Sequence, residues 1–144
     1  MDRRAPPCAC VFDVDKTITC GSPEKALELC QDAKCAVAIN TARPKAWLEP
    51  RLQALGFPSP PSPLFLYNPQ SYHQTAEERA QVKAQHMREL AARLQTDNLV
   101  LFDDLEANVN AVRNAGFRAQ LVGRRSQCGV DEADVYEALQ GNTS

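Results

Sequence analysis

The sequence CACVFDVDKT, residues 8–17, joins an apolar run to two aspartates and a threonine. The run 8–12 contains no polar alternation, which is typical of a parallel strand covered on both faces. Asp13 and Asp15 follow directly, and two carboxylates placed so close together repel each other. We therefore expect a buried strand whose carboxyl end carries an acidic cluster that a cation neutralises.

Four further apolar runs alternate with helical patterns along the chain of 144 residues. The strands are predicted at 35–39, 64–68, 99–102 and 117–123, the last of them at an edge, and the helices at 22–31, 43–56, 75–95, 105–116 and 131–140. Thr75 and Glu78 form a capping box that opens the longest helix, whereas Pro50 predicts a break in the second. Such alternation indicates an α/β fold, a doubly wound, Rossmann-like parallel sheet of about five strands with helices on both faces. We expect one domain, residues 1–144.

Composition and charge exclude several classes of protein. The formal net charge is −2, and the basic pairs at 3–4 and 124–125 are short and far apart, so we expect no constitutive nucleic-acid binding. No apolar stretch approaches the ~18 residues that span a bilayer, so we expect no membrane partner. The N-terminus carries no long apolar region typical of a secretory signal. These features predict a cytoplasmic protein, or one that reaches the nucleus by diffusion.

The chain contains six cysteines, and without a secretory signal we expect them to be reduced, buried thiols rather than a disulfide framework. The pair Cys8 and Cys10 has no matching second pair, which disfavours a structural zinc site.

Polar residues follow four of the predicted strands at their carboxyl ends, where doubly wound sheets bind ligands. They are Asp13, Asp15 and Thr17; Asn40, Thr41 and Arg43; Tyr67 and Asn68; and Asp103 and Asp104, with Asn108 four residues on. Taken singly, either acidic pair could cap a helix or form a turn. Together they would repel strongly unless a cation neutralised them, and all-oxygen ligands favour Mg²⁺.

Lys83 lies on the apolar stripe of the longest predicted helix. It precedes Met87, Leu90 and Leu94 by helical spacings of four, three and four residues. One interpretation is a surface lysine whose stem covers apolar area. The other is a cation that reaches the acidic edge of the sheet, where it could balance charge and bind a phosphate. His86, three residues on, is placed on a polar flank and given no role.

The ordered set DVDKT (13–17), NTARP (40–44), Lys83 and FDDLEAN (102–108) resembles the four motifs of the haloacid dehalogenase superfamily, specifically its phosphatases. The resemblance spans residues 10–122. It implies a phosphoric monoester hydrolase in which Asp13 is the nucleophile that forms an aspartyl phosphate. Asp15 would protonate the leaving oxygen and then activate the hydrolytic water.

The same resemblance implies the remaining roles. Thr41, Asn40 and Lys83 would bind phosphate. Mg²⁺ would be held by Asp13, by the backbone carbonyl of Asp15 and by the acidic pair, in which Asp104 aligns best with the usual ligand and Asp103 would lie behind it or bind through water.

The sequence departs from the family at Lys16, where many of these phosphatases carry glycine. Neither CGSPEKA (20–26) nor PQSYHQ (69–74) is long enough to fold as the cap domain that many members insert, so we expect a capless phosphatase. Such a site could admit a phosphorylated macromolecule, or a second copy in a homo-oligomer could supply its lid. The loop 57–73 would form its rim, with Tyr67, Tyr72 and His73, although an ordinary surface loop is the simpler interpretation.

Two other functions remain in view. A catalytically inactive module that keeps the fold and binds metal or phosphate would carry the same motifs, because fold does not imply function. A receiver-type signalling domain uses similar residue types in a different order along the chain, which argues against it.

Overall fold

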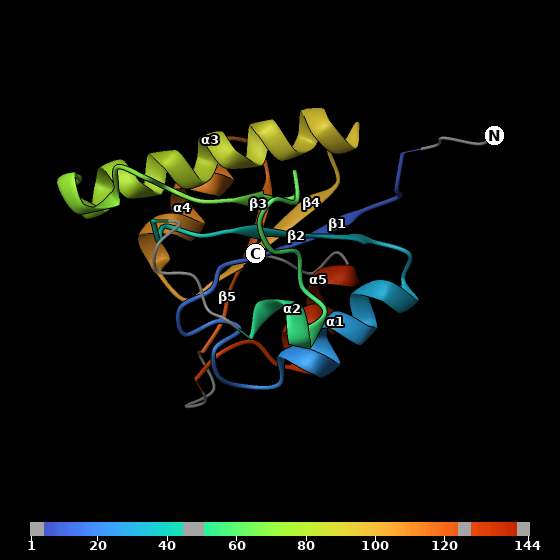
Figure 1. Ribbon diagram of the computed structural model, residues 1–144. Coiled ribbons are helices and arrows are strands. Elements are labelled where there is room, and N and C mark those ends of the chain that lie inside the picture. The colour runs from blue at the N-terminus through green and yellow to red at the C-terminus, as the bar shows by residue number, and fades with distance from the viewer. Residues whose placement is uncertain (1–4, 45–50, 124–127, 141–144) are drawn as a thin grey trace.

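The computed structural model describes residues 5–44, 51–123 and 128–140. A five-stranded sheet lies between two layers of helices, with α3 and α4 above it and α1, α2 and α5 below it in Figure 1. All neighbouring strands are parallel, in the order β3-β2-β1-β4-β5. The predicted doubly wound α/β fold is therefore confirmed.

The strands are β1 (Ala9–Phe12), β2 (Ala36–Asn40), β3 (Phe65–Leu66), β4 (Leu99–Asp103) and β5 (Arg118–Leu121). The helices are α1 (Pro23–Asp32), α2 (Leu52–Leu55), α3 (Ala76–Leu94), α4 (Glu106–Asn114) and α5 (Glu132–Leu139), with a 3₁₀ turn, η2 (Ser71–His73), between β3 and α3.

Two elements differ from their predicted extents. The strand expected at 64–68 is reduced to two residues, and at its far end the amide of Asn68 bonds to Arg43 O instead of to β2. The helix expected at 43–56 is present as α2, and Gly56 ends it with a φ of 96°. The predicted break at Pro50 lies outside the described residues.

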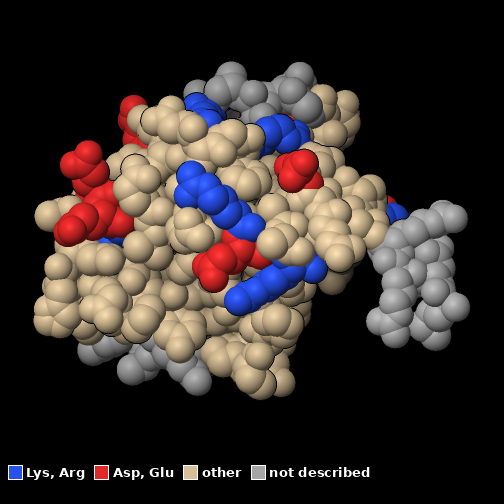
Figure 2. Space-filling view, turned by 90° about the horizontal axis from the view of Figure 1, so that it is seen from above, with Lys and Arg blue, Asp and Glu red and all other residues tan. Residues whose placement is uncertain are grey.

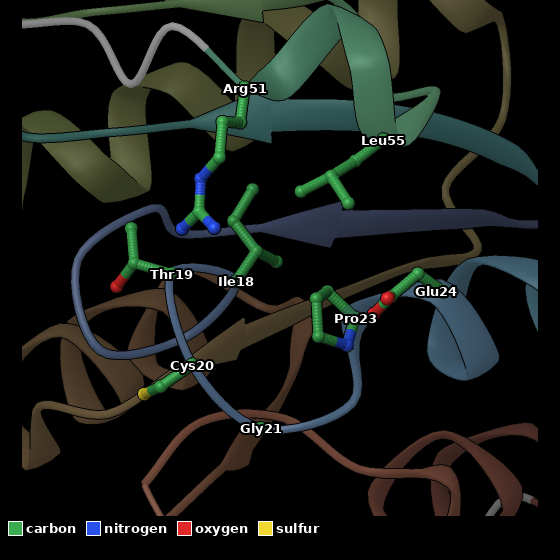
Figure 3. Close-up of a pocket in the computed structure, with 8 residues that line it drawn as sticks. All are labelled: Ile18, Thr19, Cys20, Gly21, Pro23, Glu24, Arg51 and Leu55. Atoms are coloured by element: carbon green, nitrogen blue, oxygen red, sulfur yellow. The ribbon is translucent and has the colours of Figure 1, made fainter.

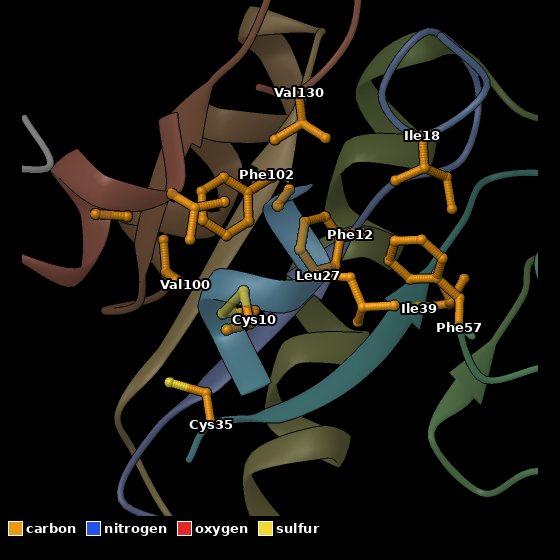
Figure 4. Close-up of a cluster of buried hydrophobic side chains, with 14 of the residues drawn as sticks. Cys10, Phe12, Ile18, Leu27, Cys35, Ile39, Phe57, Val100, Phe102 and Val130 are labelled. Carbon is orange, nitrogen blue, oxygen red and sulfur yellow. A yellow bond between two sulfur atoms is a disulfide. The ribbon is translucent and has the colours of Figure 1, made fainter. Parts of the chain in front are cut away.

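The lower core is built around Phe12, the last residue of the central strand β1. Its ring lies 5.3 Å from that of Phe57 and 5.1 Å from that of Phe102, measured between centroids (Figure 4). All three side chains are buried, and burial of one such ring stabilises a fold by roughly 1.5–3 kcal/mol. The packing holds the end of β1 against β4, directly before Asp13 and Asp103.

The upper core places α3 on the sheet. Met87 and Leu90 are fully buried, and Lys83 is buried on the same stripe, as the spacing predicts. The predicted capping box is present: Thr75 Oγ1 accepts the amide of Glu78, whose carboxylate accepts the amide of Thr75. The capping box therefore fixes where α3 begins, and the buried stripe fixes which of its faces packs on the sheet.

The prediction of reduced thiols is wrong, because the six cysteines form three disulfides. The register of β1 and β2, which pairs Ala9 with Ala36, sets Cys8 beside Cys35. Helix α1 places Cys30 over Cys10, and the bridge of Gly21 with Val130 brings Cys20 to Cys128. Disulfides persist mainly in oxidising compartments, which speaks against the cytoplasmic prediction.

None of the described helices combines the length and the apolar character that a membrane-crossing segment needs.

Candidate functional site

Asp13 lies at the carboxyl end of the central strand and is 6% exposed. Its amide donates to Phe102 O at 3.0 Å, which continues the pairing of β1 with β4. The chain then turns back on itself, and the amides of Thr17 and Ile18 both donate to Val14 O. This turn brings the buried Thr17 hydroxyl within 3.2 Å of Asp13 Oδ2, to which it donates.

Lys83 reaches the same point from the middle of α3 and is 1% exposed. Its ammonium lies 2.7 Å from Asp13 Oδ1, 2.9 Å from Asp103 Oδ2 and 2.5 Å from the backbone oxygen of Asn40. An ammonium has three N–H donors, so these three acceptors satisfy it. The interpretation of Lys83 as a surface lysine is wrong, and its buried ammonium forms ion pairs with both Asp13 and Asp103.

The acidic pair at the end of β4 divides into an inner and an outer carboxylate. Asp103 is fully buried and accepts hydrogen bonds from the amide of Leu105 at 3.0 Å and from Asn108 Nδ2 at 3.2 Å, besides its pairing with Lys83. Asp104 is only half-buried. Asp103 is thus held by the protein, while Asp104 is the more accessible of the two.

Asp13, Asp103 and Asp104 each offer one oxygen within 4.8 Å of the others, which suits a divalent cation. Opposite ligands of an octahedral Mg²⁺ lie about 4.2 Å apart, twice the usual bond length, so small movements would close the set. Three ionised carboxylates and one lysine would leave a net charge of about −2, which such a cation balances. The donors therefore fit Mg²⁺ by charge and chemistry.

Burial dominates the electrostatics of these groups. It raises the pKa of Asp13 to about 7, although Lys83 acts in the opposite direction. Burial and the neighbouring Asp103 also raise the pKa of Asp104. Burial alone would lower the pKa of Lys83, but the charges of Asp103 and Asp13 together raise it above its usual value. The cluster as it stands is short of positive charge.

Asp15 does not join this cluster through its side chain. Both of its oxygens accept from Nε of Arg43 at 2.8 Å, and Nη2 of Arg43 also donates to it. The carboxylate is 53% exposed and Arg43 is 27% exposed. The residue predicted to move protons is thus held at the mouth of the site by an arginine of the second motif.

Asn40 and Thr41, the predicted phosphate ligands after β2, are both buried. Thr41 Oγ1 accepts the amide of Arg43 at 3.1 Å, which leaves its own O–H free to donate to a ligand. The side chain of Asn40 instead faces α3: its Nδ2 donates to Lys83 O at 3.0 Å. The Thr41 hydroxyl is thus available for the predicted phosphate contact, whereas the Asn40 side chain holds α3.

His86 is a residue that sequence reasoning missed. It is buried, not on a polar flank, and its Nδ1 lies 2.8 Å from Asn40 Oδ1. The amide oxygen can only accept, so the ring donates from Nδ1. Burial, together with the charges of Lys83 and Arg93, lowers its pKa to about 4. The spacing of three from Lys83 was the signal in the sequence.

Lys16, the departure from the family pattern, has a φ of 57°. That left-handed conformation favours glycine, which explains why a glycine suits this position. The exposed Lys16 side chain is tolerated there, and its amide donates to Thr19 Oγ1 at 3.0 Å.

The three candidate residues in the loop 57–73 lie in different surroundings. Tyr67 packs on the core beside Phe65, with ring centroids 6.3 Å apart. His73 is exposed, and Tyr72, which is 66% exposed, lines a pocket together with Asp15. Of the three aromatic candidates, Tyr72 is the one that lines this pocket.

A second pocket, of about 170 Å³, lies beside the turn that follows β1. Arg51 extends from the start of α2 toward Thr19 and Ile18 (Figure 3).

On the face seen in Figure 2, basic and acidic side chains are interspersed rather than gathered into one basic patch.

No protein-family model and no curated protein matches this chain.

Proposed function

We propose that this protein is a magnesium-dependent phosphatase that works through an aspartyl phosphate on Asp13, as its resemblance to the haloacid dehalogenase phosphatases implies. The observation that carries the proposal is the convergence of Asp13, Lys83 and Asp103 at the carboxyl ends of β1 and β4, with Asp104 beside them. A cluster that served only to stabilise the fold would gain nothing from three carboxylates that face a single lysine. A site that binds a divalent cation requires such uncompensated negative charge, and the bound cation in turn balances the charge of a phosphate.

In the first step, an oxygen of Asp13 attacks the phosphorus of a phosphate monoester. The bond between phosphorus and the ester oxygen breaks, and that oxygen receives the proton of Asp15, which enters this step as the neutral acid. Thr17 and Lys83 hold the attacking carboxylate in one orientation through their contacts with its two oxygens. The Thr41 hydroxyl is suited to donate to a phosphate oxygen as charge develops.

In the second step, water attacks the phosphorus of the aspartyl phosphate. Asp15 accepts a proton from that water, the bond between Asp13 and phosphorus breaks, and inorganic phosphate leaves. Asp13 and Asp15 return to their starting states, so the cycle balances. Bound Mg²⁺, held by Asp13, Asp104 and the backbone carbonyl of Asp15, would supply neutralisation of phosphate charge.

The substrate proposed for this site is a phosphate monoester on an accessible carrier such as a phosphoprotein. The described segments 13–22 and 67–75, where family members often insert a cap, hold no helix other than the short turn η2. An open site of this kind does not need to enclose its substrate. A second copy of the chain is the alternative source of a lid.

One observation favours a second candidate, a catalytically inactive module that binds metal or phosphate. Asp15, the proton donor of the mechanism, is bound by Arg43 rather than directed at the cluster. A domain that binds without turnover would tolerate this pair permanently. A phosphatase requires the pair to open when substrate arrives.

Phosphate release from small phosphate esters, phosphopeptides and phosphorylated nucleic-acid ends separates the two candidates when it is measured beside Mg²⁺ binding by calorimetry. The phosphatase releases phosphate in proportion to bound Mg²⁺. A module that binds Mg²⁺ and stays folded, yet releases no phosphate from any class, contradicts the enzyme and supports the alternative.

A further inference from the structure

The pocket beside Asp15 has a volume of about 240 Å³, and Arg43, Ser71, Tyr72 and Arg79 share its lining. It brings together four segments: the first motif at Asp15, the second motif, the 3₁₀ turn η2 and the first turn of α3. Because Asp15 is the proposed donor to the leaving oxygen, whatever is bonded to that oxygen must pass this pocket. The pocket is thus placed to contact the part of a substrate that leaves.

Arg79 gives the pocket an excess of positive charge. Its Nη1 donates to Gln74 O at 2.6 Å and to Ser71 O at 3.3 Å. These bonds fix the guanidinium but use only one of its nitrogens, so Nε and Nη2 remain able to bind a ligand. Within the described part of the chain, no carboxylate forms an ion pair with Arg79.

Arg43 supplies the second cation, and its position is also fixed. Its amide donates to Thr41 Oγ1, and its carbonyl accepts the amide of Asn68 at 3.2 Å. Its guanidinium binds Asp15 from the pocket wall. With Arg43 bound to Asp15, Arg79 is the cation of the pocket that forms no ion pair with a described carboxylate, at a partly exposed site where an anion can enter.

We propose, on the basis of the proposed phosphatase function, that this pocket is a subsite for a second anionic group on the leaving portion of the substrate. The substrate class is a phosphate monoester whose carrier bears a carboxylate or another phosphate near the ester oxygen. Arg79 binds that anion, and Tyr72 offers an aromatic face beside it. The anion also competes with Asp15 for Arg43, which frees Asp15 to move a proton.

The test uses two pairs of aryl phosphates whose members differ by one anionic group. One pair is 3-carboxyphenyl phosphate and its neutral carboxamide analogue; the other is benzene-1,3-diyl bisphosphate and phenyl phosphate. The values of kcat/KM are measured with Mg²⁺ for the wild type, Arg79→Gln, Arg79→Lys and Arg88→Gln. Arg88 is the matched control, since it is exposed on the same helix and bonds to Gln85.

We expect the wild type to prefer, in each pair, the ester that carries the second anionic group about tenfold, as one charge-assisted contact allows. Arg79→Gln should reduce that ratio to about one, Arg79→Lys should retain part of it, and Arg88→Gln should leave it intact. A preference for only one pair would identify the anion as carboxylate or phosphate, and would support the subsite. Equal kcat/KM within both pairs, or a preference that survives in Arg79→Gln, overturns it while the phosphatase stands.

Binding of the same four compounds to Asp13→Asn, measured by calorimetry, separates the two proposals. If the wild type releases no phosphate but Asp13→Asn binds the charged esters more tightly through Arg79, the subsite stands and the phosphatase fails. If neither turnover nor differential binding is found, both proposals fail.

Discussion

The ammonium of Lys83 lies 2.7 Å from Oδ1 of Asp13, although seventy positions separate the two residues in the chain. Strand β1 ends at the centre of the sheet edge and places Asp13 there. Helix α3, which lies above the sheet in Figure 1, carries Lys83 to the same point. Both side chains are almost fully buried. The contact joins the central strand of the sheet to α3 and contributes to the charge of the proposed active site.

Replacement of Lys83 by methionine should remove this charge while it keeps the volume of the side chain. Asp13 and Asp103 would then be buried without their partner, so we expect metal-free Lys83→Met to lose about 3–5 kcal/mol of unfolding free energy. Urea unfolding measures the loss. Lys25→Met is the control: Lys25 is 67% exposed in its pair with Glu132, so a change below about 1 kcal/mol is expected. Equal stability of the two variants contradicts the assigned role.

Lys16 should be replaceable by glycine with a gain in stability. Its φ of 57° costs an L-residue about 1–2 kcal/mol, which glycine avoids at the expense of greater freedom in the unfolded chain. We expect Lys16→Gly to exceed Lys16→Ala in unfolding free energy by up to about 1 kcal/mol, because alanine keeps the unfavourable backbone. An alanine variant at least as stable as the glycine variant would show that the left-handed conformation is absent.

The buried His86 should make stability fall as the solution becomes acidic. Its pKa is lowered from 6.5 to about 4, so the unfolded chain takes up the proton first. The contribution is complete above pH 6.5 and is lost progressively as the pH falls toward 4, by up to about 3 kcal/mol.

The matched variant for this measurement is His86→Gln, whose amide can still donate to Asn40 but does not titrate. Urea unfolding of both proteins between pH 7.5 and 4.5 should give curves that diverge below pH 6.5, with the wild type losing more. Parallel curves would mean that His86 is protonated or exposed in the folded protein.

The three disulfides should be detectable without any assay of function. Protein isolated under oxidising conditions and unfolded in guanidinium should react with a thiol reagent only after reduction, with six thiols then titrated. Peptide mapping should pair Cys20 with Cys128, which closes the longest loop, so the double serine variant should lose about 2–5 kcal/mol. Reactive thiols before reduction contradict the pairing.

The strands and the direction of Lys83 could be predicted because each depends on local patterning. A run such as CACVF has the composition of a strand covered on both faces, and helical spacing from Met87 and Leu90 sets the side of α3 on which Lys83 lies. The aspartates then follow from where parallel strands end. These features needed no knowledge of which segments touch.

The cysteine pairs, the Asp15–Arg43 pair and the bond from His86 to Asn40 could not be predicted in the same way. Each depends on the register or the approach of two segments that are distant in sequence. His86 shows the difference clearly: the sequence analysis placed it on a polar flank, and nothing in the sequence identified Asn40 as its partner. Such long-range contacts pair Asp15, the proposed acid, with Arg43 and bury His86 against Asn40.

The central claim is that Asp13 carries the phosphoryl group, and phosphate release from an aryl phosphate by the wild type and by Asp13→Asn tests it most directly. Asparagine keeps the shape of the side chain, so circular dichroism should show an unchanged fold in the variant. The account predicts release by the wild type that requires Mg²⁺, stops with a chelator, and is abolished in Asp13→Asn. A folded wild type that binds Mg²⁺ without releasing phosphate, or an Asp13→Asn variant that retains activity, would contradict it.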